Sequence, residues 1–424
     1  MSHLRLMLLL GLLIGTGAAR AHDMIPAPQQ TGAILLQNAT VHSVLHGVQP
    51  HTDVLLEQGK ITAIGPKLTH ADANIIDLSG KHLYPGLIAL DTTLGLTEIS
   101  MVRATNDTRD VGDDNPQLQA STAYNPDSEL LPTVRVHGIT HAQSTPRGKG
   151  LAGQSLLVSL DAWTVEDAAH PASRQFHLYW PTLPKRYADK EKTAKARSRY
   201  QQAVARIEDY FTAAQRYRLG ADSQQHIKED IRWQALLPLL RGEGKLFVHA
   251  DTQQAIEEAA ALARAHKLPL VIVGGYDAWR LADVLNEQNA AVIYTHTLDL
   301  PLRGDEPIGQ AFRIPALLKQ AGIPFALGFS SDWNSRNLPL AAAQTVAWGL
   351  TPQEALKAIT YDAAQIIGAP GLGAIAVGFD ASLVISSGDI LDPLTTKIEA
   401  VYIDGRQVDL NNRHRQLYQK YLKR

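Results

Sequence analysis

Between residues 245 and 348 the sequence alternates four times between a short apolar strand and a helical pattern. Alternation of this kind predicts parallel strands that are covered by the helices connecting them. Four such units in succession favour either a (β/α)8 barrel or a doubly wound sheet. The expected strands are KLFVHA, LPLVIVGG, AAVIYTHT and IPFALGFSS, and the expected helices are 253–266, 277–288, 314–320 and 339–348.

Both ends of the chain carry β patterns. Short strands are expected between Ala33 and Asp77, with a tight turn at Gln58-Gly59. Strands return after Ala381, where Asp404-Gly405 between two apolar runs is a strong hairpin signal. Neither set is long enough for an independent domain, so the two ends are expected to build one sheet together.

Two helices can be placed from their own signals. Thr351 is expected to cap a helix that begins at Pro352, because Glu354 stands three residues after the cap. A long amphipathic helix is expected from Tyr187 to Tyr217, where apolar residues recur at helical spacing among charges. This helix would either pack on the exterior of the central domain or act as a lid.

Composition narrows the function classes. The 424 residues have 45% hydrophobic and 19% charged side chains, which is typical of a globular protein with a large core. The formal net charge of −2 gives no field that favours nucleic acid or anionic lipid, so a small molecule is the expected partner. The chain has no cysteine, which excludes disulfides and thiolate metal ligands.

The first residues have the order of a secretory signal peptide. Arg5 precedes the apolar run from Leu6 to Ile14, and small residues follow to Ala19-Arg20-Ala21. We therefore expect residues 1–21 to be removed, which leaves His22 first, and the mature protein to be periplasmic or secreted. No later segment offers the run of about 18 apolar residues that a membrane span needs.

Five segments, taken together and in this order, resemble the amidohydrolase superfamily, in particular its exported imidazolonepropionase-like members. The resemblance covers about Ala33 to Leu410. The segments are PGLIALDTT (85–93), VHAD from His249, FALGFSSD up to Asp332, GLTPQEALKAIT (349–360) and GLGAIAVGFDASLVI (371–385).

The resemblance implies a fold and a chemistry. The fold is an α/β metal-dependent-hydrolase-type (β/α)8 TIM barrel with a small composite β-sandwich domain formed by both termini. The chemistry is hydrolysis of non-peptide carbon–nitrogen bonds, often in a cyclic amide, with a divalent metal such as zinc activating a water. The implied division is a signal peptide (1–21), the composite sandwich (33–84 with 371–410), the barrel (85–370) and a basic tail (411–424).

Most positions at which the family places its metal ligands are changed here. The His-x-His of the first strand is missing, and of the family's four histidines one is matched. The aligned positions are Asp91 and Thr93 on the first strand, His249 on the fifth, Gly274 or Gly275 on the sixth, and Phe329 or Ser330 on the last, with Asp332 two residues further.

The resemblance therefore gives a candidate site with a degenerate metal centre. His249 is expected as the metal ligand and Asp332 as the catalytic acid–base group. Asp91, Thr93, Gly274 and His296 are expected to line the substrate pocket, since the ends of different strands converge at a barrel mouth. Asp91, His296 and Asp332 would rebuild a metal site, or else these residues are hydrogen-bonded pocket, core and capping residues.

Two glycine- or aspartate-rich loops allow alternative interpretations. The loop 145–153 (TPRGKGLAG) resembles a phosphate loop only in its glycines, because it lacks the Gly-Lys-Ser/Thr ending, and a turn is favoured. The loop 106–115 has four aspartates without EF-hand spacing, which favours a surface loop. Two functions stay open: an amidohydrolase-like hydrolase, and a non-catalytic binding or scaffold protein with the same pocket.

Overall fold

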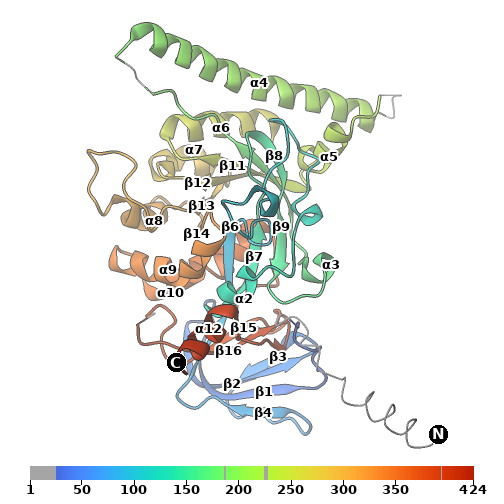
Figure 1. The fold of residues 1–424 in the computed structure, drawn as a ribbon, viewed down its shortest axis with the longest axis vertical. Coiled ribbons are helices and arrows are strands. Elements are labelled where there is room, and N and C mark those ends of the chain that lie inside the picture. Colours follow the sequence, from blue (N-terminus) through green and yellow to red (C-terminus); the bar gives the residue numbers. More distant parts are fainter. Residues whose placement is uncertain (1–24, 186–187, 224–227, 393) are drawn as a thin grey trace, which may run out of the picture.

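The structure is a computed structural model that describes residues 25–185, 188–223, 228–392 and 394–424. The expected signal peptide, the cleavage site and Tyr187 lie outside the described residues. Within the described ranges, no helix is long and apolar enough to cross a membrane. The chain forms a β-rich region that holds both ends, a central α/β region, and a long helix, α4, along the far side of that region (Figure 1).

The four strand–helix units expected between residues 245 and 348 are confirmed. Their strands pair in parallel, in chain order. One helix begins four residues before the expected Ile314, and another opens with a 3-10 turn, η3. The bounds are β11 Gly244–Ala250, α6 Gln253–His266, β12 Leu270–Gly274, η3 Ala278–Leu281, α7 Ala282–Glu287, β13 Ala291–Tyr294, α8 Gln310–Gln320, β14 Phe325–Leu327 and α9 Leu338–Ala347.

The strands of the central region form two mixed sheets, so the expected single ring of eight parallel strands is corrected. One sheet has the order β14-β13-β12-β11-β10-β8 and the other β6-β7-β9. An isolated parallel bridge from Leu90 to Gly328 links them at one seam. The strands not yet given are β6 Leu87–Thr92, β7 Ile139–Ser144, β8 Gly150–Gln154, β9 Leu156–Ser159 and β10 Arg174–Tyr179.

The antiparallel strands have a physical reason. Residues 145–149 between β7 and β8 are too few for the helical crossover that a parallel return needs. The chain therefore turns back, so that β9 runs antiparallel to β7 and β8 runs antiparallel to β10. The loop that resembles a phosphate loop thus provides a turn and the strand β8.

Both ends of the chain contribute strands to one eight-stranded sheet, with the order β17-β16-β15-β5-β1-β2-β3 and β4 beside β1. Hydrogen bonds join these strands into one sheet, and the expected sandwich stays a prediction. The turns at Gln58-Gly59 and Asp404-Gly405 form with positive φ at all four residues, as expected. The bounds are β1 Ile34–His42, β2 Val48–Glu57, β3 Lys60–Gly65, β4 Asn74–Asp77, β5 His82–Pro85, β15 Leu383–Ser386, β16 Ile398–Ile403 and β17 Arg406–Gln407.

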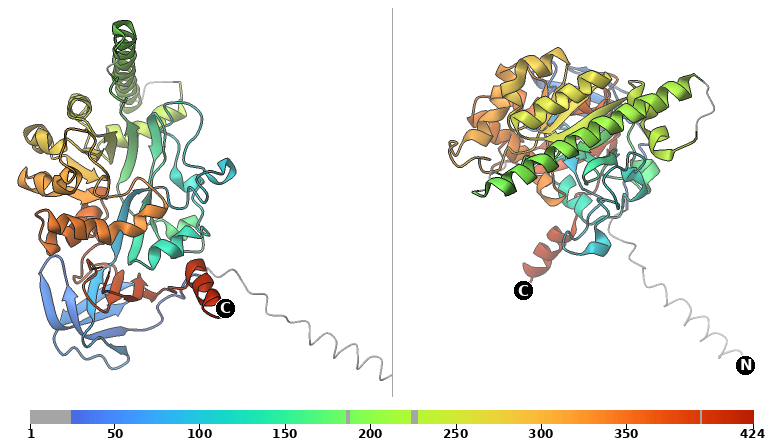
Figure 2. Two further views of the ribbon diagram at one scale, coloured as in Figure 1. Left: turned by 60° about the vertical axis from the view of Figure 1, so that its left-hand side comes forward. Right: turned by 90° about the horizontal axis from the view of Figure 1, so that it is seen from above.

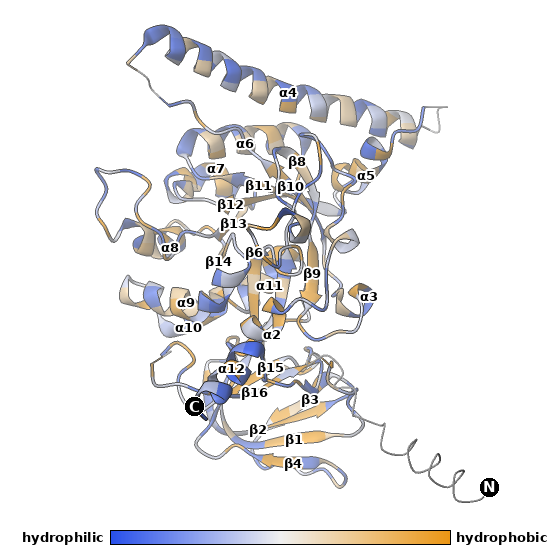
Figure 3. Cartoon of the chain, viewed as in Figure 1, coloured by the Kyte–Doolittle hydropathy of each residue, from blue (hydrophilic) through white to orange (hydrophobic). Residues whose placement is uncertain are grey.

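The long helix α4 (Lys190–Asp222) is confirmed and packs on the outside of the central region. Its buried side chains are Tyr200, Ile207, Phe211 and Ala214. It contacts α5 (Ile231–Leu240) and α6, and its first turns project beyond the body of the molecule (Figure 2). Hydrophobic residues gather in the sheets and hydrophilic ones on the outer face of α4 (Figure 3). In this position α4 packs on the exterior of the central region and does not act as a lid.

The remaining helices are short. Thr351 and Glu354 make the expected capping box at the start of α10. The bounds are η1 Arg103–Thr105, η2 Ala120–Thr122, α2 Leu130–Arg135, α3 Val165–Ala168, η4 Trp333–Asn337, α10 Pro352–Ala358, α11 Tyr361–Ile367 and α12 Arg413–Tyr421.

One apolar cluster lies directly beneath the candidate site. Alternate side chains of five central strands meet in it: Ile88 and Leu90 (β6), Phe247 (β11), Val271 and Val273 (β12), Ile293 (β13) and Ala326 (β14). Because strand side chains alternate between faces, His249 lies on the same face as Phe247, one step nearer the carboxyl end. The polar residues that follow these strands therefore lie directly above a packed apolar cluster.

Candidate functional site

A pocket of about 480 Å³ lies where the central strands end. Its walls come from the carboxyl ends of β10, β11, β12 and β13 and from the segments that follow them. Three of the expected site residues line it: His249, Gly274 and His296. In α/β folds of this kind, ligands bind at the carboxyl ends of the strands, so this pocket is the candidate functional site.

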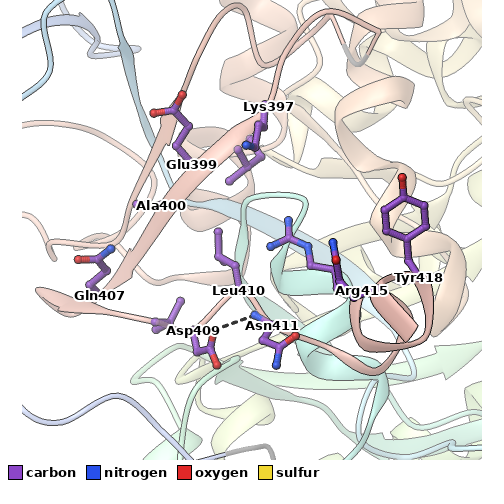
Figure 4. A pocket seen from close by; sticks show the side chains of 12 residues that line it. Lys397, Glu399, Ala400, Gln407, Asp409, Leu410, Asn411, Arg415 and Tyr418 are labelled. Carbon is purple, nitrogen blue, oxygen red and sulfur yellow. Dashed lines mark hydrogen bonds between the residues drawn. The ribbon is translucent and has the colours of Figure 1, made fainter. Parts of the chain in front are cut away.

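A larger groove of about 1150 Å³ lies elsewhere, between β16 and α12 (Figure 4). Lys397, Leu410, Arg415 and Tyr418 are among its lining residues. It contains none of the expected site residues and belongs to the sheet built from the two ends. We therefore do not assign the site to this groove.

Asp91 lies at the end of β6, next to the pocket, and is fully buried. Its backbone is left-handed, with φ of +55°, and the pairing of β6 with β7 shifts register there. A bulge of this kind re-aims a side chain. The carboxylate accepts hydrogen bonds from Nη1 of Arg147 at 2.7 Å and from the hydroxyl of Ser330.

Arg147 holds both the side chain and the backbone of Asp91. Nη2 of Arg147 donates to the Asp91 carbonyl oxygen at 2.7 Å, and Nη1 also donates to the Tyr179 hydroxyl at 3.1 Å. Burial lowers the pKa of Arg147, but the Asp91 carboxylate outweighs burial and holds the pKa above its ordinary value. Arg147 therefore stays charged beside Asp91.

His249 contacts two other ring side chains, His177 and Tyr179. Its Nε2 lies 3.0 Å from Nδ1 of His177, which in turn places Nε2 2.8 Å from the Ser155 hydroxyl. The Tyr179 ring stacks on it, with centroids 3.9 Å apart. Burial, with a smaller effect of the Arg147 charge, lowers the pKa of His249 well below its ordinary value. His249 is thus a neutral, hydrogen-bonded imidazole.

His296 belongs to a second charged group on the other side of the pocket. Its Nε2 donates to Asp251 at 2.7 Å and its Nδ1 donates to Asp299 at 2.8 Å. Burial lowers the pKa of His296, but these two hydrogen bonds outweigh it and raise the pKa to about 9. Near pH 7 this side chain is an imidazolium between two carboxylates.

Gly274 makes room for that group. A Cβ on Gly274 would lie 2.2 Å from Oδ1 of Asp251, and the glycine has φ of +92°. The Asp251 side chain therefore fills the space that a side chain on β12 would otherwise occupy. The histidine expected there by the resemblance is replaced by a glycine, an aspartate that follows β11 and a histidine that follows β13.

Thr93 and Asp332 do not line the pocket. The carbonyl of Thr93 accepts backbone hydrogen bonds from Leu96 and Thr97 in the turn after β6. Asp332 caps η4, because its carboxylate accepts the Trp333 N–H at 2.5 Å. The structure thus brings His249, Gly274, His296 and, through Arg147, Asp91 together, and it places Asp332 in the capping role that was the alternative for it.

The residues at the strand ends do not fit a divalent metal. The Asp91 carboxylate, the only acid on the first strand, is paired with Arg147 and Ser330, and Nε2 of His249 is paired with His177. Among the described residues, no group of three or more His, Asp or Glu side chains is arranged to hold a metal ion. Zinc chemistry requires three protein ligands with free lone pairs, and here those atoms already have protein partners.

Sequence reasoning missed four residues of the site: Arg147, His177, Tyr179 and Asp251. Asp251 follows directly after His249-Ala250 and was visible as the last letter of VHAD. Arg147 lies in the loop 145–153, which was weighed only as a phosphate loop or a turn. An arginine can be recognised as the partner of a strand-end aspartate only when the two residues are known to lie close together in the fold.

Comparison with known proteins agrees with the fold. Residues 248–408 match the family model described as "Amidohydrolase family". The crystal structure of an amidohydrolase from Thermotoga maritima MSB8 is 26% identical and covers 89% of this chain and 99% of its own, with a TM-score of 0.78. These matches show that the chain is similar to amidohydrolases over most of its length.

Two further relatives extend the comparison. Amidohydrolase tasK of Hapsidospora irregularis is 24% identical over 389 residues, which are 83% of this chain and 39% of that protein. The chain therefore spans about two fifths of the length of this curated relative. A putative prolidase from Bifidobacterium longum, 17% identical with a TM-score of 0.53, covers 93% of this chain and 100% of its own and shares the fold.

Proposed function

We propose that this chain is a small-molecule-binding member of the amidohydrolase superfamily that works without the superfamily's metal. The observation that carries the proposal is the pairing at the strand ends, where Arg147 holds Asp91 and His177 holds His249. The pocket keeps the size and the position of a small-molecule site. Its ligand class, a small molecule with a non-peptide carbon–nitrogen bond such as a cyclic amide, is taken from the superfamily.

Hydrolysis of such a bond is the second candidate, and Asp251 favours it. This carboxylate is 40% exposed, lines the pocket, and stands beside the His296 imidazolium. A carboxylate in that position can take a proton from an attacking water. The superfamily match over residues 248–408 includes both residues.

One experiment distinguishes the two candidates. Thermal shift against a panel of cyclic amides and dipeptides, in the presence of EDTA, is expected to give hits, because a ligand that binds only the folded state raises the Tm. Each hit is then incubated with the protein and followed by mass spectrometry. An intact ligand supports binding, and cleavage in EDTA supports the metal-free hydrolase. Cleavage that requires added metal would contradict both.

A matched pair of tryptophan variants tests whether the ligands found by thermal shift bind in the pocket. Trp180 lines the pocket and is 7% exposed, whereas Trp163 is 63% exposed and lies outside it. Trp180→Ala is expected to weaken ligand binding about tenfold or more, since a buried aromatic wall contributes on the order of 1.5 kcal/mol or more. Trp163→Ala is expected to leave binding unchanged. Equal loss in both variants would place the ligand elsewhere.

We also propose that the protein is exported, on the strength of Arg5, the apolar run 6–14 and Ala19-Arg20-Ala21. Intact mass spectrometry of periplasmic or secreted material is expected to show a chain that begins at His22. Full-length protein confined to the cytosol would refute the proposal.

A further inference from the structure

We infer that α12, together with residues 422–424, is an amphipathic helix that binds the surface of a membrane containing anionic lipid. The helix belongs to the basic tail, residues 411–424. None of these residues lines the candidate pocket, so the inference holds whichever ligand the pocket takes.

The helix α12 is attached to the body at its first turn and is exposed along the rest. Asn412 is 5% exposed, and its side chain accepts the Arg415 N–H at 2.9 Å. The helix itself buries no side chain, and it stands out from the body beside the sheet built from the two ends (Figure 2). The packing of the core therefore gives no reason for α12 to have an apolar face.

The large apolar side chains of this segment nevertheless share one face. They are Leu417, Tyr418, Tyr421 and Leu422, which recur at the i, i+3, i+4 spacing of an amphipathic helix. At 100° per residue this spacing keeps them within about 140° of one another around the helix axis. Their exposed fractions lie between 39% and 63%. Four large apolar side chains exposed on one face mark an interaction surface.

Basic side chains border that face. Residues 411–424 carry five Lys or Arg and no Asp or Glu, whereas the whole chain carries 40 and 42. The rest of the chain thus holds more acidic than basic residues, and the tail is a local positive patch that the net charge of −2 conceals. On the helix, Arg415 flanks the apolar face on the side of Leu422, and Arg413 flanks it on the side of Leu417.

Helix stability accounts for only part of this charge. A cation is favourable near the C-terminus of a helix, where it meets the negative end of the macrodipole, and unfavourable near the N-terminus. Lys420 stands in the last turn of α12, but Arg413 and Arg415 stand in the first. The two arginines therefore work against the helix dipole, which points to an anionic partner outside the protein.

A membrane surface fits both the apolar face and the charges. A helix that lies in the plane of the interface buries its apolar face among the acyl chains, while Lys and Arg meet anionic headgroups. The tyrosines suit this depth because each ring is apolar and each hydroxyl is polar. A nucleic acid would use the charges but leave Leu417 and Leu422 in water, so lipid is the partner that uses the whole helix.

The test is sedimentation with vesicles of phosphatidylglycerol and phosphatidylcholine in equal parts. The chain from His22 onward is used, so that the apolar run 6–14 cannot itself bind lipid. It is expected to bind these vesicles, and to bind vesicles of phosphatidylcholine alone about tenfold more weakly or less. Raising the salt from about 0.1 M to about 0.5 M is expected to weaken binding, because salt screens exposed charges.

Two pairs of substitutions separate the apolar and the electrostatic contributions. Leu417→Gln with Leu422→Gln is expected to weaken binding about tenfold or more, because apolar area no longer leaves water. Lys420→Gln with Lys423→Gln is also expected to weaken it about tenfold or more, because each cation near an anionic surface contributes. All four side chains are exposed, so these variants are expected to melt like wild type.

Lys190→Gln with Lys192→Gln is the matched control. It makes the same change of charge at two exposed lysines in the first turn of α4, whose outer face is hydrophilic (Figure 3). This variant is expected to bind vesicles like wild type. A chain that ends at Asn412, which lacks α12 altogether, is expected not to bind them.

The orientation of the helix can be read directly, because the chain has no cysteine and one introduced cysteine carries a single dye. An environment-sensitive dye at Tyr421→Cys is expected to shift its emission to the blue when vesicles are added. The same dye at Gln419→Cys, about 160° away around the helix, is expected to shift little.

Four results would overturn the inference. Equal binding to both kinds of vesicle, or equal loss in the Lys190 and Lys420 pairs, would remove the role of the tail's charges. Equal dye shifts at Tyr421 and Gln419 would remove the role of the apolar face. Tighter binding to a DNA duplex than to vesicles, unaffected by the leucine substitutions, would make the tail a nucleic-acid site. A dimer in size exclusion that the leucine substitutions dissociate would make a second copy of the chain the partner.

Discussion

Replacing Asp161 by alanine is expected to lower the free energy of unfolding by about 3–5 kcal/mol, because it leaves buried guanidinium groups without their counter-charge. The Asp161 side chain is 2% exposed and contacts Arg135 at 2.6 Å and Arg406 at 3.1 Å. The arginine side chains are 7% and 8% exposed. Asp161 also accepts the backbone N–H of Ala27 at 2.9 Å.

The positions of these residues explain why the Asp161 side chain should contribute so much to the free energy of unfolding. Arg135 ends α2 in the central region, Arg406 belongs to β17 of the terminal sheet, and Ala27 lies on the segment before β1. Burial lowers the pKa of Arg135, and the Asp161 charge partly offsets that effect. Without Asp161, both the burial cost and the repulsion between the arginines remain.

Denaturant unfolding of wild type, Asp161→Ala and Asp161→Asn measures the effect. Asp113→Ala is the matched control, because it removes an exposed partner of Arg206 and is expected to cost less than about 1 kcal/mol. An Asp161→Ala chain that unfolds within 1 kcal/mol of the control would show that the two arginines find other acceptors.

Much of the fold could be predicted from the sequence wherever a signal is local. The apolar runs from KLFVHA to IPFALGFSS become parallel strands, Thr351 forms its capping box, and Asp404-Gly405 forms its turn. The antiparallel direction of β8 and β9 could not be predicted. A strand pattern is the same in either direction, and only the length of the preceding turn distinguishes them.

In the candidate site, too, some residues could be predicted from the sequence and others could not. His249, Gly274 and His296 meet because they end neighbouring strands, which chain order alone predicts. The pairing of Asp91 with Arg147 joins residues 56 positions apart, and no local pattern encodes it. Asp332 is the opposite case, and its catalytic role stays a prediction. It lies near the expected catalytic position in sequence, but a short polar side chain before a helix readily bonds to the next backbone N–H.

Ending the chain before Gly371 is expected to abolish soluble folding. The deletion removes β15, which pairs with β5 on one side and β16 on the other. It also removes six of the fourteen buried residues in the apolar cluster of the terminal sheet: Ile375, Ala381, Leu383, Ile385, Ala400 and Tyr402. A sheet without these strands exposes an apolar face and an unpaired edge, both of which promote aggregation.

A chain that ends at Asn412 is the control for this deletion. It lacks only α12 and the residues after it, and α12 buries no side chain. The ring contact of His414 with Trp333, with centroids 5.1 Å apart, is peripheral. This shorter deletion keeps Arg406 and hence the Asp161 cluster, so size exclusion and thermal melting are expected to show a monodisperse, cooperatively unfolding protein. If the chain ending before Gly371 melted equally well, β1 to β5 would be stable without β15, and the shared sheet would not be required for folding.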